Sequence, residues 1–209
     1  MILSPLDISA DDLVALMAAN SPNPRSTGLH QSDIIKSICR KLDPKRFGTG
    51  PMNMVKVEGG FCFEHAIEQA MAARWAQKLG LFRPGEVERD GISGSPDGLD
   101  ITADPWVGYE FKQTEMSIGN GIRDPKFQHW IWQMKGYGYM LGVRVWILIA
   151  DFLRGHYKFA PIVDEFGRTL PPGRLLLAWR FEFTDDELLM NWSMLLRHAH
   201  QEGMLIRET

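Results

Sequence analysis

The chain has 209 residues and a mass of 23.8 kDa, a length that suits one domain or one domain with an extended arm. Its hydrophobic share of 44% and charged share of 23% exclude a wholly disordered or fibrous chain. A formal net charge of −3 excludes a polybasic protein, although a local basic stretch still allows contact with phosphates. Two cysteines are too few for a disulfide framework or for an iron–sulfur cluster held by cysteines. We expect a reduced, cytoplasmic protein, because the first residues do not resemble a signal peptide and no apolar run is long enough to cross a membrane.

Residues 1–59 carry many turn formers and few long periodic stretches, which predicts a helical and irregular arm in front of a core over 60–209. Within this arm we expect one helix from Ser9 to about Asn20 and a second over 32–42. The second helix and its exit hold two acidic residues and five basic ones, namely Lys36, Arg40, Lys41, Lys45 and Arg46. This pattern fits an arm that contacts phosphates about as well as it fits a solvated helix face.

The next stretch predicts a helix followed by strands. Apolar residues at helical spacing predict a helix over 61–79, with Gly80 as its terminator. Asp90-Gly91 predicts a tight hairpin turn. We expect a three-stranded meander around this turn, over 86–89, 92–101 and 106–113.

The last third returns to regular elements. Asp124 and Pro125 predict the start of a helix that ends near Leu141. The apolar run 143–152 predicts an interior strand, followed by a strand over 175–183 and a capped helix from Thr184 to Gly203. This order predicts an α/β or α+β fold in which helices cover a central mixed sheet.

The third strand of the expected meander carries the residues with the clearest chemistry. Strand alternation places Glu110 and Lys112 on one face, and Asp97 on the neighbouring strand brings a second carboxylate to the same point. Two carboxylates and the backbone carbonyl of Phe111 suit Mg²⁺, and an adjacent lysine can orient a water or stabilise charge on a phosphate. An ordinary ion pair between Lys112 and either carboxylate explains these residues equally well.

The segments Gly94-Ser95-Pro96-Asp97 and Glu110-Phe111-Lys112 together resemble the signature of the PD-(D/E)xK nuclease superfamily. The segment from Gly60 to Glu64 resembles the G-x-x-x-E element of that superfamily, which supplies a third acidic residue. The segment from Gln133 to Tyr137 resembles the Q-x-x-x-Y motif of its RecB-like and lambda-exonuclease-like branch. The resemblance covers roughly 60–151, with the motifs in the order of the family, and it implies a restriction-endonuclease-like core.

The resemblance also implies roles for these residues. Asp97, Glu110 and the carbonyl of Phe111 would bind Mg²⁺, or Mn²⁺ in its place, and Glu64 would reach the metal directly or through water. Lys112 would be the catalytic lysine. The side chains that would touch the substrate backbone or hold the other site residues in place are Gln133 and Tyr137.

Some assignments around the site stay open at this point. Glu68, one turn after Glu64, is the alternative third acid. His129 lies one turn before Gln133 and either joins that helix face or is an ordinary surface histidine, which we favour. Three tryptophans lie near the motifs, and we favour core packing over base stacking for them: Trp106, Trp130 and Trp132.

The function implied by the resemblance is that of a metal-dependent deoxyribonuclease. The Q-x-x-x-Y motif favours a phage-type exonuclease that processes DNA ends in recombination, repair or phage replication. Besides Gln133 and Tyr137, the nucleic-acid contacts we expect are Lys36, Arg40 and Lys41. Two alternatives remain, a DNA-binding or assembly subunit that lacks catalysis and a structure-specific endonuclease. A homo-oligomer or a recombination partner protein also stays open.

Overall fold

The computed structural model describes residues 28–48, 60, 62–67, 69, 81–116, 122–156, 162–163, 169–170 and 173–205. Its main sheet has the strand order β10-β7-β6-β5-β2. These strands are β2 (Leu81–Phe82), β5 (Gly98–Asp100), β6 (Val107–Thr114), β7 (Val145–His156) and β10 (Gly173–Glu182). Strands β6 and β7 are parallel and the other neighbours are antiparallel. The predicted fold class, a central mixed sheet flanked by helices, is confirmed, and the expected strand 143–152 is interior because β7 lies between β6 and β10.

A second, three-stranded sheet has the order β1-β4-β3 and is also mixed. It consists of β1 (Leu29–His30), β3 (Val87–Arg89) and β4 (Ile92–Gly94). Asp90 and Gly91 have φ angles of 52° and 73°, the left-handed geometry that a two-residue hairpin needs, so the predicted turn is confirmed. A separate short hairpin pairs β8 (Ile162–Val163) with β9 (Thr169–Leu170).

The expected meander is wrong in one important respect. The stretch 92–101 is not a single strand, because β4 belongs to the small sheet and β5 to the large one. The chain leaves one sheet and enters the other at Ser95, Pro96 and Asp97. Proline has no amide hydrogen to donate to a sheet ladder, which explains why the strand breaks at this point. Asp97 therefore lies in a connecting loop and not within a strand.

The helices largely follow the expected boundaries. Helix α2 spans Gln31–Leu42, α4 spans Gln128–Leu141 after a 3-10 turn (η1, Pro125–Phe127), and α5 spans Asp185–Gln201. Asp124 accepts a hydrogen bond from the amide of Lys126, and Thr184 forms a complete capping box with Glu187. The expected helix over 61–79 is described at 60, 62–67 and 69, and its remaining residues, like the expected helix over 9–20, lie outside the described residues.

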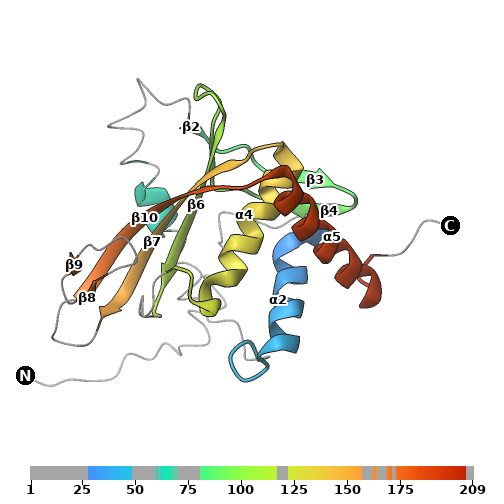
Figure 1. Ribbon diagram of the computed structural model, residues 1–209, viewed down its shortest axis with the longest axis horizontal. Coiled ribbons are helices and arrows are strands. Elements are labelled where there is room, and N and C mark those ends of the chain that lie inside the picture. The colour runs from blue at the N-terminus through green and yellow to red at the C-terminus, as the bar shows by residue number, and fades with distance from the viewer. Residues whose placement is uncertain are drawn as a thin grey trace, which may run out of the picture.

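The helices lie on both faces of the main sheet. Figure 1 shows α2, α4 and α5 gathered on one side of it, and Trp130, Met134 and Tyr137 of α4 pack there against β7. On the other face, Phe63 packs against Tyr109 and Phe111 of β6. Strand β6 is thus covered on both sides. Since neighbouring side chains alternate along a strand, Glu110 and Lys112 point toward the α4 side.

Helix α2 belongs to the same packed body as the core. Ile34 and Ile38 are buried against Trp192 and Leu195 of α5. The basic residues of this helix lie on its other, exposed side. Among the described residues, no helix is both long enough and apolar enough to cross a membrane.

Candidate active site

The point where β5 and β6 separate creates the candidate site. The pairing of these strands reaches Tyr109 opposite Gly98, and beyond it β5 no longer covers the edge of β6. The Asp97 side chain takes its place, because Oδ2 accepts a 2.7 Å hydrogen bond from the amide of Phe111. The N–H and C=O groups of a strand residue point to the same side, so the carbonyl of Phe111 also faces the side of Asp97.

Glu110 and Lys112 form the centre of this site. Glu110 is 0% exposed, and its Oε1 forms an ion pair with Lys112, whose side chain is 21% exposed. Among the described residues, Oε2 of Glu110 has no hydrogen-bond partner. Burial, followed by the charge of Asp97, raises the pKa of Glu110 to about 8. Burial opposes the charge of Lys112, but the neighbouring carboxylates outweigh it and raise the lysine pKa, so Lys112 is a cation at neutral pH.

Glu64 approaches the same point from the helix on the opposite face of the sheet. Its Oε2 accepts a hydrogen bond of 3.2 Å from Arg83. Burial and the charge of Asp97 raise the pKa of Glu64 to about 7, while Lys112 and Arg83 lower it. The three acidic residues predicted for the site therefore lie close enough to perturb one another. The alternative acid, Glu68, lies outside the described residues.

Helix α4 supplies the polar wall of the site. Gln133 donates a 2.8 Å hydrogen bond from Nε2 to the hydroxyl of Tyr137, which is also hydrogen-bonded to the backbone of Ser95. Burial and the charge of Glu110 raise the pKa of Tyr137, so it remains a neutral phenol. A Cβ atom on Gly94 would lie 2.6 Å from the Tyr137 ring. The ring thus contacts the end of β4, and its hydroxyl contacts the first residue of the loop that carries Asp97.

His129 lies one turn before Gln133 on this helix and is not the ordinary surface histidine that we favoured. Its ring packs against Phe47 and Trp130, with a centroid separation of 5.6 Å in each case. Burial, followed by the charges of Lys112 and Arg46, lowers the pKa of His129 to about 4. His129 is therefore neutral at physiological pH.

The carboxylates and the carbonyl of Phe111 fit a hard divalent cation. Oxygen is the ligand that Mg²⁺ prefers, and proteins commonly hold Mg²⁺ through one or two carboxylates plus water. The buried and unpartnered Oε2 of Glu110 and the raised pKa values of Glu64 and Glu110 show that the ionised carboxylates are disfavoured here unless a further positive charge is bound. Among the described residues, no group of three or more His, Cys, Asp or Glu side chains is arranged to hold a metal ion. The groups that could hold the cation are therefore two carboxylates, Asp97 and Glu110, and the backbone carbonyl of Phe111.

The structure does not bring the predicted basic contacts to this site. Lys36 lies 3.9 Å from Asp33 in an ion pair, Lys41 pairs with Glu202 of the last helix, and Arg40 is exposed. These side chains extend from the outer face of α2. The expectation that they bind DNA stays a prediction.

One contact of the site has no local signal in the sequence, and two other residues lie outside the site or the core. Arg83 lies 19 residues from Glu64, and no local spacing predicts their contact. The side chain of Asp100 is not in the site, because Oδ1 accepts hydrogen bonds from the amides of Thr102 and Ala103 and from the Thr102 hydroxyl. Trp130 is in the core as expected, but Trp106 is 48% exposed and that expectation is wrong for it.

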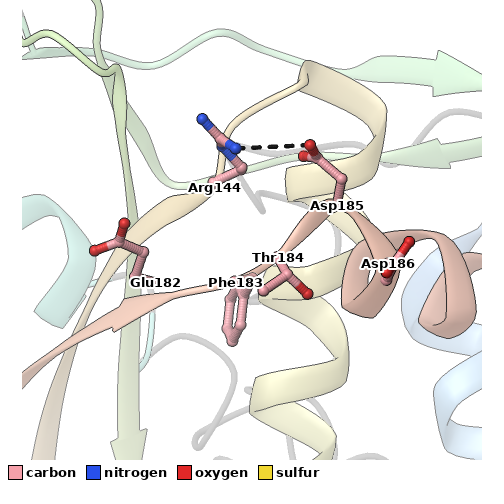
Figure 2. Close-up of a pocket in the computed structure, with 6 residues that line it drawn as sticks. All are labelled: Arg144, Glu182, Phe183, Thr184, Asp185 and Asp186. Atoms are coloured by element: carbon pink, nitrogen blue, oxygen red, sulfur yellow. Dashed lines mark ion pairs between the residues drawn. The ribbon is translucent and has the colours of Figure 1, made fainter.

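A surface hollow of about 450 Å³ lies apart from the residues described above. It is bounded by the start of β7, the end of β10 and the start of α5. Figure 2 shows an ion pair across it, in which Arg144 lies 3.6 Å from Asp185. None of the candidate site residues lines this hollow, whose lining is Arg144, Glu182, Phe183, Thr184, Asp185 and Asp186.

The fold and the site together define an α/β protein with a buried carboxylate beside a lysine. No protein-family model matches the chain, and no curated protein matches it. The chain is similar to an alkaline exonuclease (LHK-Exo) from Laribacter hongkongensis, at 18% identity over 90% of this chain and 87% of that chain, with a TM-score of 0.47. It is similar to a phage related exonuclease from Haemophilus somnus 129PT, at 14% identity over 83% and 82% of the two chains, with a TM-score of 0.48. It is also similar to SSO0001, at 11% identity over 95% and 87%, with a TM-score of 0.47.

Proposed function

We propose that this protein is a Mg²⁺-dependent nuclease that hydrolyses phosphodiester bonds in DNA. The observation that carries the proposal is the fully buried Glu110, which has an unpartnered oxygen among the described residues and lies beside Lys112 and within the field of Asp97. Burial of a carboxylate with an unpartnered oxygen costs free energy, and an uncharged side chain could fill a purely structural position without that cost. A bound cation would remove that cost.

The residues of the site have different roles in this proposal. Asp97, Glu110 and the carbonyl of Phe111 would hold Mg²⁺, and Glu64 would reach it directly or through water. When bound, the ion supplies positive charge that favours attack of water on phosphorus and neutralises the phosphate oxygens. Lys112, as an ammonium group, donates hydrogen bonds to charge that develops on the phosphate.

The α4 residues act by positioning. Tyr137 contacts the loop that carries Asp97 through the Ser95 backbone and the space left by Gly94, and Gln133 fixes the Tyr137 hydroxyl. The resemblance of the segment from Gln133 to Tyr137 to the Q-x-x-x-Y motif supports an exonuclease over an endonuclease. We therefore place the activity at DNA ends, in recombination, repair or phage replication.

The test is incubation of the purified protein with linear and with covalently closed circular DNA. Each reaction contains Mg²⁺, Mn²⁺ or a chelator, and the Asp97→Asn variant is the control for contaminating nucleases. We expect shortening of linear DNA with either metal and no reaction with chelator. Cleavage of circular DNA would indicate an endonuclease instead. Binding of DNA without cleavage under any condition would refute the enzyme and leave the DNA-binding subunit.

A further inference from the structure

The loop after α2 connects the basic N-terminal stretch to the candidate site through one arginine. Nη2 of Arg46 donates a 3.1 Å hydrogen bond to the carbonyl of Lys126, just before α4, and contacts the sulfur of Met116, just after β6. The neighbouring Phe47 packs edge-on against His129. The loop is thus attached to both elements that form the site.

The chain itself limits the distance between Arg46 and the catalytic lysine. Met116 lies four residues after Lys112, so their Cα atoms are at most about 14 Å apart in a fully extended chain. The charges of Lys112 and Arg46 both act on the imidazole of His129, so both cations lie near this side chain. Phosphates follow one another every ~3.4 Å along the axis of a duplex strand, so a backbone separation of this order corresponds to a few nucleotides.

Arg46 differs in its partners from two other basic residues of its stretch. Lys36 pairs with Asp33 and Lys41 pairs with Glu202. Among the described residues, Arg46 forms no ion pair with a carboxylate. Its guanidinium contacts a neutral carbonyl, a thioether and the face of the Phe47 ring, at 5.2 Å from the centroid. An exposed guanidinium that is held in place without a counter-charge is suited to a phosphate group.

We propose that Arg46 forms a phosphate-binding subsite for the DNA strand that enters the active site, with Phe47 and His129 setting the distance between this subsite and Lys112. The inference rests on the proposed nuclease function and deepens it. A strand that passes over Lys112 then brings a second phosphate to Arg46, a few nucleotides from the bond that is cut. Arg46 binds and orients the strand, and Phe47 is a positioning residue.

The test measures the affinity for a defined DNA duplex at several salt concentrations, with Ca²⁺ replacing Mg²⁺ to block cleavage. Loss of one phosphate contact flattens the plot of log affinity against log salt by about 0.9. Between 50 and 200 mM salt, the affinity of Arg46→Ala should therefore fall about 3.5-fold less than that of the parent. Arg46→Lys should keep the parental slope. Arg197→Ala, which removes an exposed arginine from α5, is the matched control and should also keep it.

A double-mutant cycle tests the role of Phe47. Phe47→Ala should flatten the salt plot in the parent but have little further effect in the Arg46→Ala background, because it acts through the arginine. A parental slope in Arg46→Ala, or equal flattening in Arg197→Ala, would overturn the subsite while leaving the nuclease intact. Flattening by Arg40→Ala without flattening by Arg46→Ala would place the contact on α2 instead. A protein that neither binds nor cuts DNA would refute both proposals.

Discussion

Replacement of Glu110 by Gln should stabilise the metal-free protein in a way that depends on pH. Glu110 is fully buried, and burial together with Asp97 raises its pKa from 4.5 to about 8. A carboxyl group with a raised pKa favours the folded state below about pH 4.5, and that contribution is lost as the pH rises through about 8. Glutamine stays neutral throughout. The stability advantage of Glu110→Gln should therefore grow between these two pH values and become constant above them.

The size of the effect follows from the two pKa values. At ~1.4 kcal/mol per pH unit, the interval between 4.5 and about 8 corresponds to on the order of 5 kcal/mol. For a chain of this length, 1 kcal/mol changes the melting temperature by roughly 2–4 °C, so the upper limit is roughly 10–20 °C. The ion pair with Lys112 forms only when Glu110 is ionised, and it already lowers the Glu110 pKa to the value of about 8 used here. Its loss in Glu110→Gln therefore adds no separate dependence on pH.

The assay is urea unfolding of the parent and of Glu110→Gln in chelator, from pH 5 to pH 9. Glu88→Gln, which neutralises an exposed carboxylate on β3, is the control and should follow the parent at every pH. Addition of Mg²⁺ at pH 9 should restore stability to the parent and have less effect on Glu110→Gln, because ligands stabilise the state that binds them. A constant difference between parent and variant across the pH range would show that Glu110 is ionised in the folded protein and would refute the reasoning.

Substitutions at three further positions test individual contacts of the site. Asp97→Asn should abolish cleavage and keep the fold. Asp97→Ala should abolish cleavage and also lower the free energy of unfolding by about 1–3 kcal/mol, because the Phe111 amide loses its acceptor. Nuclease assays and urea unfolding distinguish the two variants. Lys112→Met should lower kcat by about 10²–10³ and keep DNA affinity in Ca²⁺, and an equal loss of both would make Lys112 a phosphate anchor only. Gly94→Ala should cost about 1–3 kcal/mol and lower kcat, because its Cβ would displace the Tyr137 ring; a variant with parental stability would contradict the packing.

Local signals in the sequence predicted much of the framework. The capping box at Thr184, the turn at Asp90-Gly91 and the start at Asp124 each depend on a few neighbouring residues, and the structure has all three. The alternation along β6 placed Glu110 and Lys112 on one face for the same reason. Signals of this kind need no knowledge of the rest of the chain.

Features that depend on distant residues were not predictable. The pairing of Arg83 with Glu64 joins side chains from separate elements, and the contact between Arg46 and the carbonyl of Lys126 spans 80 residues. The division of 92–101 between two sheets was also not predictable, because the sequence pattern through Pro96 is compatible with one unbroken strand. Only the pairing partners of β4 and β5 show the break.

That break is the feature on which the candidate site depends. A continuous strand through Asp97 would give the amide of Phe111 a backbone acceptor and turn the Asp97 side chain to one face of the sheet. Because the chain changes sheets at Pro96, Asp97 instead caps the open edge of β6 with its carboxylate. The same gap leaves room beside Ser95 for the hydroxyl of Tyr137. The break at Pro96, which the predicted meander did not include, therefore brings the Asp97 carboxylate, the Phe111 carbonyl and Tyr137 of α4 close together.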